Sequence, residues 1–217
     1  MSDILSLVSE LTARRQEEKD RRRSDIIDAA AASAADEGFE SITMDNVARR
    51  ARVSRALLYV YFQDKHALHM ALCERAMELL LERFAVATRD APNGLARLEA
   101  MGRAYVRYAR EQPVYFQALA HLEARHPEEV KHLRCIELSN ICHGNMTRAI
   151  REGIADGSIR GDLGSPDAVA VALWGFMHGV IHIANTKVAL LSLRNTDALQ
   201  LYDEAVVLTR RALSARQ

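Results

Sequence analysis

Residues 23–68 read RSDIIDAAAASAADEGFESITMDNVARRARVSRALLYVYFQDKHAL. Apolar residues recur along this stretch at helical spacing and short polar breaks interrupt them, which predicts three short helices followed at once by a fourth. The first helix is expected from about 24 to 37, closed by Gly38, a residue suited to a left-handed cap. Thr43 and Ser54 are placed as N-caps of the next two helices, which last only about two turns each. Two short capped helices across a three-residue turn form a helix-turn-helix.

The rest of the chain also has a helical pattern. Gln63 and Asp64 are expected to cap a long helix that runs to about Thr88. Breakers divide the remainder into further helices, and no strand pattern is found. We therefore predict an all-α protein of about nine helices, in which a three-helix head with the helix-turn-helix precedes a helical domain. The later helices are expected at about 95–111, 113–122, 128–155, 167–191 and 196–213.

The head resembles the N-terminal signature of the TetR family of bacterial transcriptional regulators. The resemblance covers about a fifth of the chain; elsewhere the chain is similar to the family only in helical character and length. It implies a transcriptional regulator, and we expect a repressor released from a palindromic operator by a small-molecule effector. The matching residues are Glu37-Gly38-Phe39, Thr43, Val47-Ala48, Val53-Ser54, Leu58-Tyr59, Tyr61-Phe62, Lys65 and Ala67-Leu68.

Two positions depart from the family pattern. The family usually has glycine in the turn where this chain has Arg52, and commonly a small pair such as Gly-Thr at Ala56-Leu57. A non-glycine residue in a left-handed turn costs about 1 kcal/mol, so either the turn is reshaped or Arg52 is kept for a phosphate or base contact. Leu57 removes a hydroxyl that family members often direct at DNA.

The formal net charge is zero, from 29 basic and 29 acidic residues, so the local placement of charge decides whether nucleic acid is a partner. Arginines crowd the second and third helices and precede the first. We prefer a phosphate-neutralising patch to the alternative of solvated helix faces, because these arginines lie inside a helix-turn-helix. They are Arg49, Arg50, Arg52, Arg55 and Arg21–Arg23.

Roles in DNA binding can be assigned residue by residue. A recognition helix presents its N-terminal and exposed side chains to base edges in the major groove, here Ser54, Arg55, Ala56 and Tyr59. Arg55 is the first choice for a guanine contact. The resemblance implies that Thr43, Tyr61 and Lys65 hold phosphates and fix the register. Leu58 and Phe62 are expected in the core of the head.

Three parts are expected along the chain: a charged arm (1–20), a helix-turn-helix DNA-binding domain (21–66) and an all-α effector-binding and dimerisation domain (67–217). The arm has an apolar stripe from Ile4 to Leu11 and then a dense mixture of charges. An extension of the first helix, a disordered arm that touches DNA and an expression-dependent tail are the alternatives. We favour a helical or partly ordered arm whose arginines reach the minor groove or phosphates.

The last two predicted helices carry the argument for a dimer. The one at 167–191 is apolar around nearly its whole circumference, and small residues at Gly175 and Gly179 permit close helix contact. A homodimer through a four-helix bundle, two helices per subunit, satisfies this burial and matches the two-fold symmetry of a palindromic operator. The alternative is an ordinary monomer core.

An effector site is expected among aromatic, thioether and imidazole groups of the helical domain, which suit a mostly apolar pocket with a few polar anchors. Most of these residues are expected to be plain core, and the pocket itself is implied by the family resemblance. The candidate ligand-binding residues are Phe84, Tyr105, Tyr108, Phe116, His121, His143, Met146, Trp174, Met177 and His178.

His178 and His182 lie four residues apart on one helical face, a spacing that can hold a transition metal if His121, His143 or Cys142 adds a third ligand. We prefer an apolar effector with histidine hydrogen bonds, and expect neither a metal nor a cofactor. An enzyme is not expected, because clustered carboxylates and a nucleophile with its base are both missing. The remaining alternative is a helical small-molecule or metal-binding module with a vestigial DNA-binding head.

Composition indicates a cytoplasmic protein with no membrane partner. The chain is 49% hydrophobic and 27% charged, and we expect no apolar run long enough to span a membrane and no signal peptide. The three cysteines, Cys73, Cys135 and Cys142, are expected to be reduced core residues. Cys135 and Cys142 share a helical face, so a thiol-sensing role is the alternative.

Overall fold

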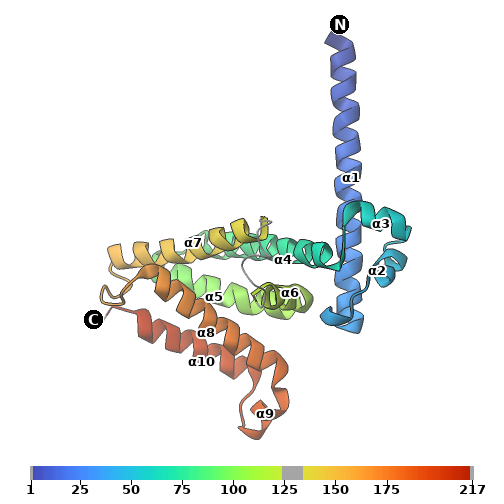
Figure 1. The fold of residues 1–217 in the computed structure, drawn as a ribbon. Helices are drawn as coiled ribbons and strands as arrows, with labels where there is room; N and C mark the ends of the chain where they lie inside the picture. The colour runs from blue at the N-terminus through green and yellow to red at the C-terminus, as the bar shows by residue number, and fades with distance from the viewer. Residues whose placement is uncertain (1, 124–133, 216–217) are drawn as a thin grey trace. The chain divides into compact units, whose positions relative to one another are not determined.

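The computed structural model describes residues 2–123 and 134–215, and within them the chain is helical with no strand (Figure 1). This confirms the all-α prediction. One more α-helix is present than expected, because the apolar stretch after residue 166 forms two helices. The elements are α1 Ser2–Glu37, a 3-10 turn Phe39–Ser41, α2 Met44–Arg50, α3 Arg55–Tyr61, α4 Lys65–Thr88, α5 Gly94–Glu111, α6 Pro113–Glu123, α7 Arg134–Ala155, α8 Pro166–Thr186, α9 Val188–Leu193 and α10 Ala198–Leu213.

The chain divides into two compact units, each described here by itself. The first unit comprises Met1–Arg75 with Gln117–Ala124, and the second comprises Ala76–Phe116 with Arg125–Gln217. Helices α4 and α6 each contribute residues to both units.

The first unit is built on α1, whose last four turns carry the apolar stripe expected there. Its core consists of fully or nearly fully buried side chains from α1, the 3-10 turn, α2, α3 and α4. Gly38 closes α1 with a φ of 88°, a value that glycine tolerates and other residues disfavour. The buried residues that hold the helix-turn-helix are Ile26, Ile27, Ala30, Phe39, Ile42, Val47, Leu58, Phe62, Leu68 and Leu72.

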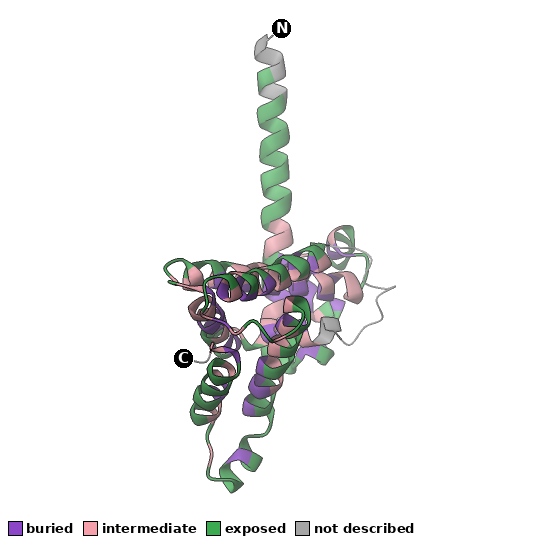
Figure 2. Cartoon of the chain, turned by 90° about the vertical axis from the view of Figure 1, so that its left-hand side faces the viewer, coloured by how far each residue is buried: buried purple, intermediate pink, exposed green. Residues whose placement is uncertain are grey.

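The charged arm is helical and continuous with α1, the first of the three alternatives. Residues 9–21 are exposed along the whole of this extension (Figure 2). Polar side chains pair along the helix, as Gln16 with Asp20 at 2.9 Å and Arg21 with Glu18. Such pairs three or four residues apart stabilise an isolated helix by about 0.2–0.5 kcal/mol each. Local pairing therefore stabilises a segment that has no apolar core of its own.

The second unit packs α5 against α7 and α10, and α8 against α7 and α10 (Figure 1). At the start of α5, Gly94 lies against the backbone of α7, so close that a Cβ atom on Gly94 would overlap Gly153 and the Ala149 carbonyl. Two N–H groups at this end are satisfied from the next loop: that of Gly94 donates to Asp156 at 2.9 Å and that of Leu95 to Ser158 at 3.2 Å. The absence of a side chain at Gly94 thus allows the start of α5 to lie directly against the backbone of α7.

The predicted helix at 167–191 is wrong in its second half. Helix α8 ends at Thr186, and Lys187 leaves helical geometry with φ −118° and ψ 34° before α9 begins. Helix α10 then begins with a capping box: the Asp197 side chain accepts from the N–H of Gln200, and the Gln200 side chain accepts from the N–H of Asp197. The helix expected at 128–155 begins, within the described residues, at Arg134; residues 128–133 lie outside them.

Helix α8 corrects one further expectation. Contrary to the prediction that no apolar run reaches membrane-spanning length, α8 is long and apolar enough to cross a membrane by length and composition alone. In the second unit it packs through Ala170, Met177, Ile181 and Ala184, which are buried, and presents other apolar residues to the outside. Only 22% of its apolar window is buried within this chain.

Candidate DNA interface and effector site

The helix-turn-helix is formed by α2, a short turn and α3, and both predicted N-caps are confirmed. The Thr43 hydroxyl accepts from the N–H of Asn46 at 3.2 Å, and the Ser54 hydroxyl accepts from the N–H of Leu57 at 3.1 Å. Each hydroxyl still has its own proton to donate. Both side chains are exposed, so each can hold a helix end and donate to a phosphate or base at the same time.

The turn keeps its left-handed geometry at Arg52. Its φ is 55°, and the turn closes through hydrogen bonds from the Arg52 N–H to the Arg49 carbonyl at 3.2 Å and from the Val53 N–H to the Ala48 carbonyl at 3.0 Å. Of the two alternatives, reshaping is therefore wrong. The Arg52 side chain is exposed at the outer side of the turn. Arg52 occupies a backbone conformation that glycine would adopt without strain.

Arg55 begins α3 and is tethered to the head. Its guanidinium lies 3.2 Å from the Asp45 carboxylate and 5.7 Å from the centre of the Tyr59 ring. The Tyr59 hydroxyl and then the Asp45 charge raise the pKa of Arg55. The side chain is well exposed, yet a guanine contact would have to replace the ion pair with Asp45.

Lys65 and Tyr61 lie where α3 passes into α4. The Lys65 ammonium donates to the Glu40 carbonyl at 2.7 Å, which ties the start of α4 to the 3-10 turn. Asp64 caps α4 as predicted by accepting from the N–H of Ala67 at 2.7 Å. Tyr61 is half-buried. Lys65 thus fixes the exit of the recognition helix, and both residues remain candidates for phosphate contacts.

Some of the arginines counted as a basic patch have partners inside the head. Arg50 pairs with Asp36, and Arg49 donates to Asn46 at 2.9 Å. Arg23 lies 3.2 Å from Glu74 and stacks over the Phe62 ring at 5.4 Å, so it helps to fix α1 on α4. In the described part of the chain, the Arg52 guanidinium makes no ion pair. The charge available to phosphates is thus concentrated around the turn.

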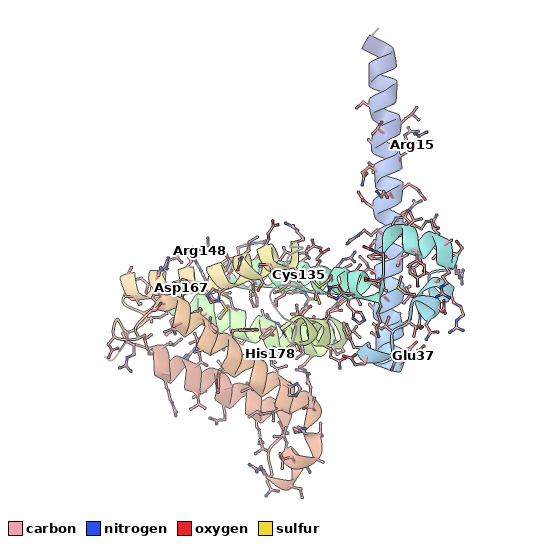
Figure 3. The ribbon with its side chains drawn as sticks, viewed as in Figure 1. Arg15, Glu37, Cys135, Arg148, Asp167 and His178 are labelled. Carbon is pink, nitrogen blue, oxygen red and sulfur yellow. The ribbon has the colours of Figure 1, made fainter. Side chains whose placement is uncertain are left out.

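An aromatic cluster forms in the second unit from residues of four helices. The Tyr105 hydroxyl of α5 and Nδ1 of His178 in α8 are 2.8 Å apart (Figure 3 labels His178). The His178 ring stacks on Phe116 of α6 with centroids 4.9 Å apart, and the centroid of the Trp174 ring lies 6.0 Å from that of His178. Phe84 of α4 meets Tyr105 edge-on at 6.5 Å. Five of the ten predicted ligand-binding residues are therefore neighbours.

The other five are placed differently. Met177 is buried on α8, and His143 and Met146 are half-buried on α7. Tyr108 is fully buried and its hydroxyl donates to the Ala76 carbonyl at 2.9 Å, which gives it a structural role between α5 and α4. The His121 side chain lies outside the described residues.

His178 is half-buried, and this burial, followed by the charge of His182, lowers the pKa of His178. This shift favours the neutral imidazole, one ring nitrogen of which is hydrogen-bonded with the Tyr105 hydroxyl. In the described ranges, no three His, Cys, Asp or Glu side chains lie close enough to hold a metal ion. Burial raises the pKa of Cys142 to about 12, and Cys73 donates to the Ala118 carbonyl at 3.1 Å. A thiol with so high a pKa is a poor redox sensor.

Sequence reasoning missed a buried charge on α5. Glu99 has only 5% of its side chain exposed, and its carboxylate accepts from Arg103 at 2.9 Å and from two nitrogens of Arg210 on α10. These bonds, that of Arg210 first, lower the pKa of Glu99. A charged residue on the apolar face of an amphipathic helix, four residues before an arginine, was the available signal.

Large apolar side chains are exposed on both α8 and α10. Val171, Phe176 and Ile183 of α8 are 41–50% exposed. Leu199 and Leu208 of α10 are more exposed still, at 56% and 52%. A Cβ atom added to Gly175 or Gly179 would meet no atom of this subunit. Large apolar patches of this kind mark protein–protein contacts.

The chain matches two family models, one described as bacterial regulatory proteins of the tetR family, over residues 26–72, and one described as the tetracyclin repressor-like C-terminal domain, over residues 98–208. The second match alone spans half of the chain. This chain therefore belongs to the TetR family, whose members are DNA-binding transcription regulators that bind operators and small-molecule effectors and act as dimers.

Relatives agree with this assignment. The HTH-type transcriptional activator FasR of Mycolicibacterium smegmatis is 32% identical over 87 residues, a stretch that spans 40% of this chain and 40% of FasR. Among solved structures, a Rhodococcus sp. RHA1 protein of unknown function has a TM-score of 0.74 and 22% identity, covering 89% of this chain and 95% of its own. The fatty acid degradation regulator FadR of Bacillus halodurans has a TM-score of 0.69 and 18% identity, covering 90% and 97%. The two structures establish a shared fold.

Proposed function

We propose that this protein is a homodimeric repressor that binds a palindromic operator and leaves it when a small-molecule effector binds. The observation that carries the proposal is the capped helix-turn-helix of α2 and α3, with an exposed recognition helix, in a chain of the TetR family. In this proposal the chain has three functional parts. Residues 21–66 bind DNA, residues 67–217 bind the effector and dimerise, and the 1–20 extension supplies further arginines to the DNA backbone. A DNA-bound role puts the protein in the cytoplasm, with no catalytic activity and no membrane partner.

In the proposed complex, the side chains of α3 reach base edges while residues at helix ends hold phosphates. Ser54, Arg55, Ala56 and Tyr59 face the major groove, and Arg55 exchanges Asp45 for its base contact. Thr43, Tyr61 and Lys65 contact phosphates, as does Arg52 from the turn. Phosphate contacts set the position of the head and make binding fall with salt.

The proposed dimer pairs α8 and α10 of one protomer with those of its partner. The exposed apolar side chains of these helices and the open space at Gly175 and Gly179 support a close four-helix contact. Two-fold symmetry then places two heads on half-sites about one DNA turn apart.

The proposed effector is a mostly apolar molecule that binds beside Tyr105 and His178. Their hydrogen-bonded pair supplies a polar anchor amid the rings of Phe84, Phe116 and Trp174. A ligand that takes over one of these polar groups favours another packing of α5 on α8. We propose that the two packings correspond to two distances between the heads of the dimer. The effector shifts the population toward the distance that does not fit the paired half-sites, so affinity for the operator falls. Met177, His143, Met146, His121 and Tyr108 complete the proposed set, Tyr108 through its support of α4.

Two observations favour a second candidate, a helical small-molecule-binding module with a vestigial head. The Arg55 guanidinium is held by Asp45, and Leu57 stands where a hydroxyl is common in the family. If the head were vestigial, the protein would bind its effector but no specific DNA.

The test is selection of genomic DNA fragments by the purified protein at two salt concentrations. A palindromic site is expected, with weaker retention at the higher salt, and the Arg55→Ala/Tyr61→Ala double variant should lose it. Arg148→Ala is the matched control, because Arg148 is an exposed arginine of α7 whose guanidinium, among the residues that the structure describes, bonds within its own helix, to Asn145 at 2.7 Å. Failure to enrich any fragment at low salt would refute the proposal and favour the binding module.

A further inference from the structure

The outward face of the recognition helix is apolar. Leu58 is fully buried and fixes the inward side of α3. At about 100° per residue, Ala56 and Val60 then lie on the opposite side, with Leu57 and Tyr59 flanking them. Val60 is 75% exposed, Tyr59 41% and Leu57 37%. The surface that a recognition helix turns toward DNA therefore consists of a methyl, an isopropyl and an isobutyl group beside one phenol ring.

Hydrogen-bonding groups are scarce on this face. Arg55 is the one charged residue in α3, and it projects along the Tyr59 flank, where Asp45 pairs with it at 3.2 Å. The Ser54 hydroxyl already accepts from the N–H of Leu57. Ala56, Leu57 and Val60 can neither donate to nor accept from a base edge. Their chemistry is limited to apolar contact.

The major groove offers one apolar group, the C5-methyl of thymine. We propose that Ala56, Leu57 and Val60 of α3 read thymine methyl groups, so that methyl burial, more than hydrogen bonding, selects the bases at the centre of each half-site. The arginines around the turn, at the N-terminal end of this surface, supply phosphate contacts that bring the apolar face against the groove. The inference rests on the proposed function, since it concerns how the same head chooses its operator.

The size of the effect follows from the burial of one methyl group, which contributes a factor of about four in affinity. Two symmetric half-sites that each bury one such methyl would together contribute about sixteenfold. Replacing thymine by deoxyuridine removes only this methyl and leaves every hydrogen-bonding group of the base unchanged. The change therefore separates apolar readout from the hydrogen-bond code.

The experiment measures operator affinity with each thymine replaced in turn by deoxyuridine in both half-sites. In the wild-type protein, one or two thymines per half-site should show a loss of about sixteenfold, and the others should show none. For the Leu57→Ala/Val60→Ala variant, the ratio of the affinity for the thymine operator to the affinity for the deoxyuridine operator should approach one at those positions. Both substituted positions are exposed, so this variant retains the core of the head. Val86→Ala, which shortens a valine of α4 that is 66% exposed, is the control that should keep the full ratio.

Three results would overturn the inference. If the wild-type protein binds a palindromic operator and no deoxyuridine replacement weakens it, methyl readout is refuted while the proposed function stands. If the ratio persists in the Leu57→Ala/Val60→Ala variant, other residues read the methyl groups. If no operator is recovered at all, the proposed function fails, and this inference fails with it.

Discussion

Gly94 is the position at which one added methyl group should do the most damage. An alanine there would place its Cβ atom well inside 3.0 Å of backbone atoms of α7, the Gly153 N–H and the Ala149 carbonyl, neither of which can rotate away. The start of α5 would have to lift off α7. That movement also stretches the hydrogen bonds that Gly94 and Leu95 donate to Asp156 and Ser158.

The magnitude can be worked from this contact. Overpacking of a rigid site typically costs about 1–3 kcal/mol, and backbone on both sides favours the upper end, about 3 kcal/mol. Alanine gains at most about 1 kcal/mol over glycine in a helix. The net loss is about 2 kcal/mol, which lowers the melting temperature of a chain of this length by about 6 °C.

Gly102→Ala provides the matched comparison, because Gly102 lies in the same helix and a Cβ atom there would meet nothing within 4 Å. Gly102→Ala should gain only the higher helix propensity of alanine, about 1 kcal/mol, and should melt about 3 °C above the wild type. Thermal denaturation followed by circular dichroism, at one protein concentration, measures both variants. Equal melting temperatures for Gly94→Ala and Gly102→Ala would show that the close approach of α5 and α7 does not constrain the fold.

Three further predictions concern the turn, the buried carboxylate and the exposed apolar side chains of α8 and α10. Arg52→Gly should relieve the left-handed strain and raise the melting temperature by about 2 °C, yet reduce the salt dependence of DNA binding by about two ions, one for each protomer of the proposed dimer; an unchanged slope would exclude a phosphate contact. Hydrogen bonds from Arg210 and then Arg103 lower the pKa of Glu99, so its ionised form stabilises the fold above pH 4.5 and this stabilisation is lost as the pH falls toward the folded pKa. Glu99→Gln should therefore melt a few degrees below the wild type at pH 7, and the difference in melting temperature should narrow at pH 4; a constant difference would contradict the assignment. Phe176→Glu should yield a folded monomer by light scattering, and a persistent dimer would refute the proposed α8–α10 contact.

Local capping rules explain how well the head could be predicted from sequence. The hydroxyls of Thr43 and Ser54 and the carboxylate of Asp64 each accept from an N–H three residues away, so the residue type and its position are sufficient. The left-handed turn at Arg52 is also local. For the same reason, α4 begins and ends where its caps and breakers predict.

Features that depend on tertiary packing could not be predicted in the same way. Three polar residues, Asn185, Thr186 and Lys187, interrupt the apolar pattern where α8 gives way to α9, but such residues also occur inside helices, so they do not by themselves predict a break. The pairing of Arg55 with Asp45 depends on the angle between α2 and α3. The kinds of residue that surround His178 could be predicted from the sequence. The sequence does not, however, distinguish Tyr105, whose hydroxyl is hydrogen-bonded with His178, from Tyr108 of the same helix, whose hydroxyl donates to the Ala76 carbonyl.

The unbroken α1 has a consequence for how the protein behaves in solution. Residues 2–21 add about 30 Å of single helix ahead of the head, at 1.5 Å per residue. Such a rod increases friction far more than it increases mass, so this protein should elute from a gel-filtration column earlier than a compact protein of equal mass. A calibrated column would therefore overstate the number of subunits, and the mass should be taken from light scattering or sedimentation equilibrium.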